Sequence, residues 1–97
     1  MVESVKISDS TSNGKKYQAI FYTDGTKTKT IHFGQKGADD FTKKGDSDQK
    51  QRYLDRHRKN ENWNSPQTAG ALSRWILWNK KSLTASISDF KKRFNLN

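Results

Sequence analysis

Residues 16–33 have the sequence KYQAIFYTDGTKTKTIHF, and this stretch specifies the β-structure of the chain. Two runs rich in aromatic and β-branched residues, 16–23 and 27–33, flank the dipeptide Asp24-Gly25. Asp-Gly is a strong hairpin signal, because a type I′ turn needs positive φ at both of its central positions. In strand periodicity the hairpin has an apolar face that carries Tyr17, Ala19, Phe21, Ile31 and Phe33. The sequence therefore predicts an antiparallel β-hairpin.

The segment before the hairpin contains Val2, Val5 and Ile7, which could form a third short strand. Residues 8–14 are polar turn formers and predict a flexible loop. We therefore expect residues 1–14 to hold a short strand and a flexible polar loop. Residues 15–97 are expected to form a single small basic domain, because 97 residues is one domain's worth of chain.

Three short helices are expected after the hairpin, at about 47–60, 68–80 and 84–95, because the apolar period changes from two to about 3.6. Asp46 or Ser47 could cap the first helix and Thr68 the second, while Ser86 and Asp89 have the spacing of a capping box in the third. The inward positions of the three helices are Tyr53, Leu54 and His57, then Ala69, Leu72, Trp75, Ile76 and Trp78, then Leu83, Ile87, Phe90 and Phe94. The predicted fold class is α+β. An N-terminal antiparallel β-hairpin, to which a third short strand could add, packs against three short α-helices.

The expected core is thin and rich in aromatic side chains. Only 30% of the residues are hydrophobic and 30% are charged, but 11% are aromatic, and aromatic side chains bury large areas. Trp75 and Trp78 share a helix face with Leu72 and are expected in this core. Trp63 follows Asn62 in a polar loop, where it could either pack or stay open to a partner.

The charge of the chain predicts a negatively charged partner. Nineteen Lys and Arg stand against ten Asp and Glu, which gives a net charge of +9. The absence of cysteine excludes disulfides, thiolate metal sites and cysteine nucleophiles. No apolar run approaches the roughly 20 residues of a membrane span, and the N-terminus lacks the apolar core of a signal peptide. We therefore expect a protein that is not secreted and has no membrane partner.

Residues 50–81 thread cations through large aromatic side chains, and this run holds most of the candidate contact residues. Arg52, Arg56 and Lys59 recur at i, i+4 and i+7 and so share one helix face. Guanidinium groups bind phosphate oxygens through paired donors, whereas Lys supplies a point charge. The candidate nucleic-acid-binding residues are Lys36, Lys50, Arg52, Arg56, Arg58, Lys59, Trp63, Arg74, Lys80, Lys81, Lys91, Lys92 and Arg93.

Several of these residues also carry a resemblance to a known family. The segments that carry it are His32-Phe33-Gly34, Lys36-Gly37, Asp40-Phe41, Arg52-Tyr53, Arg56-His57-Arg58, Glu61-Asn62-Trp63 and Gly70–Trp78. Over residues 16–95 the chain resembles a family of small basic proteins encoded by large double-stranded DNA viruses of algae and amoebae. Phe41 stands where that family has a Tyr. The resemblance implies a viral protein in the virion or in the infected host cell, in its nucleus or a cytoplasmic viral factory. It implies no activity.

Few residues in the sequence could form a catalytic or metal-binding site. His57 and Glu61 are four residues apart, but metal sites need three or four converging ligands, and Arg56 and Arg58 would oppose a cation. We expect no metal, no cofactor and no enzymatic activity.

Two binding alternatives stay open. The loop at 34–37, with Lys36, Lys43 and Lys44, could hold a phosphate through its backbone amides. The helices at 68–80 and 84–95 could also form a helix-turn-helix, with Ser86, Ser88, Lys91 and Lys92 toward the major groove.

The composition and the cation pattern together favour a non-enzymatic nucleic-acid-binding protein. Binding would depend mainly on contacts to the phosphate backbone, with little sequence specificity and with DNA favoured over RNA. The alternative is a structural or adaptor protein of the virion that docks an acidic viral or host protein. Whether the basic clusters form one surface depends on how the helices pack.

Overall fold

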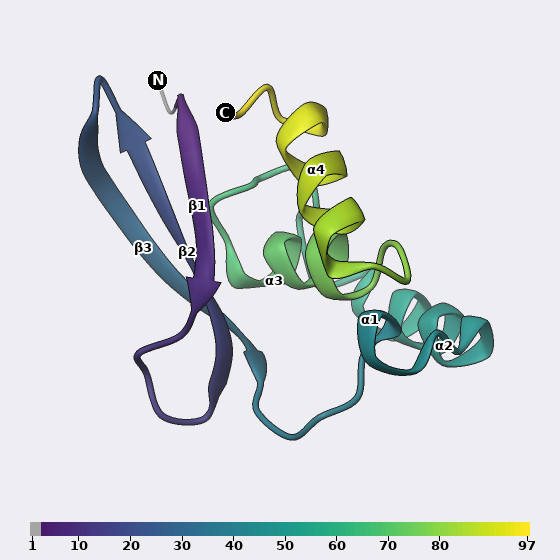
Figure 1. The fold of residues 1–97 in the computed structure, drawn as a ribbon. Coiled ribbons are helices and arrows are strands. Elements are labelled where there is room, and N and C mark those ends of the chain that lie inside the picture. Colours follow the sequence, from purple (N-terminus) through teal and green to yellow (C-terminus); the bar gives the residue numbers. More distant parts are fainter. Residues whose placement is uncertain (1–2) are drawn as a thin grey trace.

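The computed structural model describes residues 3–97 and confirms the α+β class. A three-stranded antiparallel sheet has the order β1-β2-β3, with strands β1 (Ser4–Asp9), β2 (Lys15–Thr23) and β3 (Thr26–Gln35). The helical elements are α1 (Phe41–Lys44), α2 (Ser47–His57), α3 (Ala69–Leu72), the π-helix η1 (Ser73–Leu77) and α4 (Leu83–Arg93). All of the labelled helices lie on one side of the sheet, and α1 and α2 are farther from it than α3 and α4 (Figure 1).

The predicted hairpin is confirmed, and so is the third strand beside it. Asp24 and Gly25 have φ of 51° and 76°, the signs that a type I′ turn requires. Val5 of β1 pairs with Phe21, and Ile7 pairs with Ala19, so that β1 extends the apolar face of the hairpin. Val2, which was also expected in this strand, lies outside the described residues.

The C-terminal residues cover the outer edge of β1. The Val5 amide donates to the Asn97 carbonyl at 3.0 Å, and the Asn97 amide donates to the Glu3 carbonyl at 3.0 Å. Leu96 is buried beside this pairing. An edge strand exposes unpaired backbone groups, and here part of that edge is satisfied by the chain itself.

Helix α2 begins where the sequence predicts and ends earlier, at His57 rather than near residue 60. The Asp46 side chain caps it by accepting from the amides of Asp48 and Gln49. A short helix that was not predicted, α1, precedes it and is capped by Asp40, which accepts from the amides of Thr42 and Lys43.

The predicted second helix is divided into α3 and η1 and ends at Leu77 rather than at residue 80. Thr68 caps α3 as expected, through the Ala71 amide. Farther along, the Trp78 amide donates to the Ser73 carbonyl at 3.0 Å, which is the i→i−5 bond of a π-helix. After Leu72 and up to residue 80, the buried residues are Ile76, Leu77 and Trp78, and Leu77 was not among the predicted inward positions.

The predicted capping box of the last helix is wrong, because α4 begins earlier. Ser82 is the N-cap and accepts from the Ala85 amide at 3.2 Å. Ser86 is fully buried instead, and its hydroxyl accepts from the Lys80 amide and donates to the Lys80 carbonyl. It fixes the connection between η1 and α4 to the helix body.

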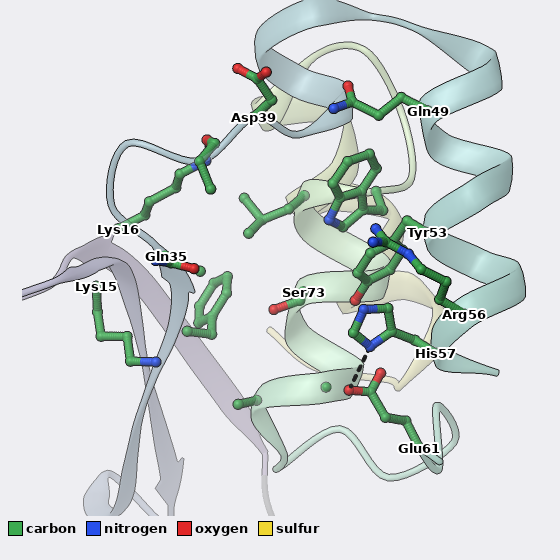
Figure 2. A pocket seen from close by; sticks show the side chains of 17 residues that line it. Lys15, Lys16, Gln35, Asp39, Gln49, Tyr53, Arg56, His57, Glu61 and Ser73 are labelled. Carbon is green, nitrogen blue, oxygen red and sulfur yellow. Dashed lines mark hydrogen bonds and ion pairs between the residues drawn. The ribbon is translucent and has the colours of Figure 1, made fainter. Parts of the chain in front are cut away.

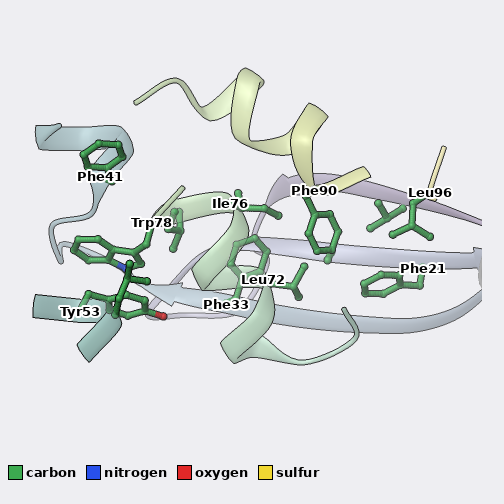
Figure 3. Close-up of a cluster of buried hydrophobic side chains, with 13 residues drawn as sticks. Phe21, Phe33, Phe41, Tyr53, Leu72, Ile76, Trp78, Phe90 and Leu96 are labelled. Atoms are coloured by element: carbon green, nitrogen blue, oxygen red, sulfur yellow. The ribbon is translucent and has the colours of Figure 1, made fainter. Parts of the chain in front are cut away.

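The core runs the length of the molecule between the sheet and the helices (Figure 3). Its side chains with no exposure include Phe21, Phe33, Leu72, Ile76 and Phe90. Tyr53 and Trp78 extend the core to α2 and are buried, as the sequence predicts. Trp75 departs from its prediction, because it is only partly buried and packs at the margin of the cluster.

Candidate nucleic-acid interface

Four exposed cations lie on and just after α2: Arg52, Arg56, Arg58 and Lys59. We call them the α2 cation face. They are left outside because α2 buries Tyr53 and Leu54 against the core. Among residues 3–97, none of the four has a carboxylate oxygen within 4.0 Å. The sequence therefore places four unpaired positive charges within eight consecutive positions.

The acidic residues near this face make other contacts. Asp55 accepts from the Gln51 side-chain amide at 3.0 Å. Glu61 accepts from the Trp63 indole N–H at 3.0 Å and lies 3.4 Å from Nδ1 of His57. These carboxylates do not neutralise the arginines, so the α2 cation face remains available to an anionic partner.

Two other candidate residues, Lys50 and Arg74, point into the protein. Lys50 Nζ donates to the Asn79 carbonyl at 2.7 Å and lies 4.8 Å from the centre of the Phe41 ring. Arg74 Nη1 donates to the Trp78 carbonyl at 2.8 Å. Both cations therefore satisfy carbonyls at the C-terminal end of η1, where a helix leaves its acceptors without partners. They form the inward cation pair.

Burial is the main electrostatic effect on this pair. It lowers the pKa of Lys50, and the charges of Arg74 and Lys80 lower it further. Burial likewise lowers the pKa of Arg74, with a further contribution from Arg93. Desolvated cations that already donate to carbonyls are poorly placed to meet a phosphate.

Trp63 and Trp75 join the cations in one packed cluster. The Trp75 indole N–H donates to the Trp63 carbonyl at 2.8 Å. The guanidinium carbons of Arg74 and Arg93 lie 4.2 and 3.8 Å from the centre of the Trp75 ring. Arg74 also lies 5.5 Å from the Trp63 ring, so Trp63 is partly packed rather than free in a loop. These contacts favour a structural role for Trp63.

The two basic clusters that flank α4 do not come together. A Cβ on Gly45 would lie 3.5 Å from the side-chain carbons of Lys81, and the charge of Lys80 acts on Lys50, so both lysines adjoin α1 and the start of α2. Lys91, Lys92 and Arg93 lie in the last turn of α4, about 15 Å farther along at 1.5 Å per residue. Arg93 is also 3.3 Å from Asp89.

The loop at 34–41 keeps Lys36 exposed but uses many of its other groups internally. The Lys36 amide donates to the Gly14 carbonyl at 2.9 Å. Asp39 pairs with Lys44 at 3.0 Å and with Lys43 at 3.9 Å. The groups that the sequence suggested for binding a phosphate are therefore partly engaged within the protein. The helix-turn-helix hypothesis is also weakened, because Ser86, one of the residues expected toward the major groove, is buried.

A cleft of about 420 Å³ lies beside the α2 cation face, between the end of the sheet and α2 (Figure 2). Lys15 and Gln35 line it on the sheet side, and Arg56 and His57 on the opposite side, with Ser73 of η1 between them. Sequence reasoning missed this cleft, because it forms only where β3, α2 and η1 meet.

A stack of three rings forms the α2 side of the cleft. Trp78 and Tyr53 stack with ring centres 4.6 Å apart and planes 9° apart, and His57 follows at 4.4 Å from Tyr53. Tyr53 and Trp78 are buried, whereas the His57 side chain is 40% exposed. Burial raises the pKa of the Tyr53 hydroxyl, which therefore stays protonated and can donate a hydrogen bond.

Two glycines lie where the walls of the cleft contact each other closely. A Cβ on Gly34 would lie 2.9 Å from Cδ1 of Leu77, and the φ of 78° at this position also favours glycine. A Cβ on Gly70 would lie 2.8 Å from the carboxyl carbon of Glu61, which rests on α3. Both glycines were visible in the sequence, but their contacts were not.

The described residues contain no group of three or more His, Cys, Asp or Glu side chains that could hold a metal ion. None of the helices in this part of the chain is long and apolar enough to cross a membrane.

Residues 5–57 match a family of unknown function (DUF5754). The match covers more than half of the chain. The chain belongs to this family. No curated protein and no solved structure matches the chain. The span shared with the DUF5754 family includes most of the sheet, α1 and α2, and therefore both side walls of the cleft. It also includes Arg52 and Arg56 of the α2 cation face, whereas η1 and α4 lie beyond it.

Proposed function

We propose that the protein binds nucleic acid without catalysing a reaction, mainly through the phosphate backbone and with little sequence specificity. The observation that carries the proposal is the α2 cation face, Arg52, Arg56, Arg58 and Lys59, which is exposed and has no carboxylate partner among residues 3–97. Like charges held together in a folded protein repel each other, and phosphates would relieve that repulsion.

The spacing of the face suits a nucleic-acid backbone. Arg52 and Arg56 lie one helical turn apart, about 6 Å along the axis of α2 at 1.5 Å per residue, and Lys59 follows in the turn after the helix. One strand of DNA carries a phosphate per 3.4 Å of its axis, so the spacing of the two arginines corresponds to about two phosphate steps, and Lys59 extends the face beyond them. Arginine adds paired donors that fit phosphate oxygens. DNA is favoured over RNA only through the viral setting, which rests on the family resemblance of residues 16–95.

The test is a binding panel with duplex DNA, single-stranded DNA and RNA at two salt concentrations. We expect affinity to fall steeply with salt, since each phosphate contact releases counterions. Arg52→Glu, Arg56→Glu and Lys59→Glu together should abolish binding while the circular dichroism spectrum stays unchanged. The matched control is Lys6→Glu, Lys27→Glu and Lys29→Glu, which removes the same charge from exposed positions spread over β1 and β3. An equal loss of nucleic-acid affinity in both triple variants would show that binding depends on the net charge of the protein and not on the α2 cation face.

An adaptor role is the alternative, because the same cations could meet carboxylates on an acidic viral or host protein. Capture of partners from infected cells, with and without nuclease, separates the two. A protein partner that survives both nuclease and high salt would favour docking. Loss of all partners after nuclease treatment would favour nucleic acid.

A further inference from the structure

We propose that the cleft between β3, α2 and η1 receives one unpaired nucleotide of a single strand. This inference rests on the proposed function and adds a preference for single strands over duplex. The cleft adjoins the α2 cation face through Arg56, which belongs to both. A strand held by its phosphates along α2 would therefore pass the mouth of the cleft.

The size of the cleft matches one small polar ligand. Its volume of about 420 Å³ is in the lower part of the range of small-molecule sites. A base pair within a duplex could not enter, because its edges and faces are occupied by pairing and stacking. A base that is already unpaired enters without that unstacking cost.

The cleft offers groups that read the edge of a base. Gln35 and Gln49 carry amides, and Ser73 carries a hydroxyl, so donors and acceptors line the same space. The Oε1 atom of Gln49 is buried and has no hydrogen-bond partner within residues 3–97. A buried acceptor without a partner is unfavourable, and because Gln49 lines the cleft, a rotation of its side chain would bring this oxygen to a ring N–H or an exocyclic amino group of a base.

The ring stack offers a surface for the face of the base. His57 is its outermost ring and the most exposed of the three, beyond the buried Tyr53 and Trp78. Single-stranded nucleic acids are commonly recognised by stacking of bases on aromatic and histidine rings.

Charge on both walls supplies the phosphate contacts. Lys15 on the sheet side is exposed, and Arg56 lies opposite on α2 (Figure 2). Among the described residues neither has a carboxylate within 4.0 Å. The acids of the cleft are paired instead, Asp39 with Lys44 and Glu61 with His57.

The floor of the cleft contains the irregular part of the helical layer. Ser73 and Leu77, the first and last residues of η1, both line it. π-Helical turns are rare and occur frequently at functional sites. Ser73 continues the helix of α3 through its amide, and its carbonyl accepts the wide i→i−5 bond from the Trp78 amide at 3.0 Å.

The experiment compares fluorescence anisotropy of a single-stranded DNA 12-mer and a blunt 12-base-pair duplex at one salt concentration. We expect the wild type to bind the single strand at least tenfold more tightly. Ser73→Leu fills the floor and should remove that preference while duplex affinity changes less than twofold. Ser88→Leu, the same change at an exposed position of α4, is the matched control and should keep it.

A second variant guards against misfolding of Ser73→Leu. Gln49→Leu removes the buried unpaired acceptor at nearly constant size, so the melting temperature should stay level or rise while single-strand affinity falls at least fivefold. Equal binding of both DNA forms by the wild type, or unchanged single-strand affinity in both cleft variants, would overturn the inference. In either case, salt-dependent duplex binding would leave the proposed function standing, whereas no binding of any nucleic acid at low salt would refute both.

Discussion

The α2 cation face and the inward cation pair come from the same basic run of sequence, yet their side chains have opposite surroundings. Arg52, Arg56 and Lys59 are exposed, whereas Lys50 and Arg74 donate to the carbonyls of Asn79 and Trp78. The phase of the helix explains the difference on α2. Lys50 shares its stripe with Tyr53 and Leu54 at i, i+3 and i+4, and these two are the buried residues of α2. Position on the helix, rather than charge, determines which cations can meet a partner.

Arg74→Ala tests the inward pair and should have the largest effect on stability. The variant loses the charged hydrogen bond from Arg74 to the Trp78 carbonyl and the contacts of Arg74 with the rings of Trp75 and Trp63. We expect the free energy of unfolding to fall by about 2–3 kcal/mol in urea denaturation. Arg58→Ala, at an exposed position, is the control and should stay within about 0.5 kcal/mol of the wild type. Equal stability of the two variants would erase the distinction between the two groups.

Lys50→Met should lower stability without changing DNA affinity, whereas Lys59→Met should lower DNA affinity without changing stability. Lys50→Met keeps an apolar stem near Phe41 but leaves the Asn79 carbonyl without its donor, so we expect a loss of about 1 kcal/mol of stability and unchanged DNA affinity. Lys59→Met should leave stability unchanged and weaken DNA binding. Urea denaturation and anisotropy titrations on both variants check this. Weakened DNA binding by Lys50→Met would place Lys50 in the interface.

Asp89 gives the smallest expected effect, through pH. Burial opposes its ionisation, but the hydrogen bond from Asn79 and the charge of Arg93 outweigh burial and hold its pKa below the usual value. Since the folded-state pKa is lower than the unfolded one, its contribution is complete above about pH 4 and is lost as pH falls through the folded value. Asp89→Asn should therefore cost up to about 1 kcal/mol at pH 7, and the difference from the wild type should shrink below pH 4 in urea titrations. A difference that stays constant to pH 2 would assign it to packing.

Much of the fold could be predicted from local signals. Asp24-Gly25 specified the hairpin, and the period of apolar residues located three helical regions. The details that failed depend on competition between nearby signals. Ser82 and Ser86 are both suitable caps, and only packing of Ser86 against Lys80 shows that α4 begins at the earlier one. The π-turn after Leu72 likewise depends on tertiary contacts of η1.

The candidate site was predictable only in part. The shared face of Arg52 and Arg56 followed from helix spacing and both are exposed, whereas Lys59 is exposed in the turn after α2. The inward direction of Arg74 did not follow, because it depends on contacts with the Trp78 carbonyl and the rings of Trp63 and Trp75. The cleft could not be predicted at all, since Gln35, Arg56 and Ser73 come from three elements distant in sequence.

The most direct test of the account is the salt dependence of duplex DNA binding in Arg52→Ala, Arg56→Ala and Lys59→Ala combined. Duplex DNA is chosen because the cleft is not expected to contribute to its binding. If these three side chains contact phosphates, the slope of log affinity against log salt should become shallower by about 2.7, or about 0.9 for each lost contact. Lys6→Ala, Lys27→Ala and Lys29→Ala combined should leave the slope unchanged. A slope identical to the wild type in the α2 variant would contradict the assignment of this face to nucleic acid.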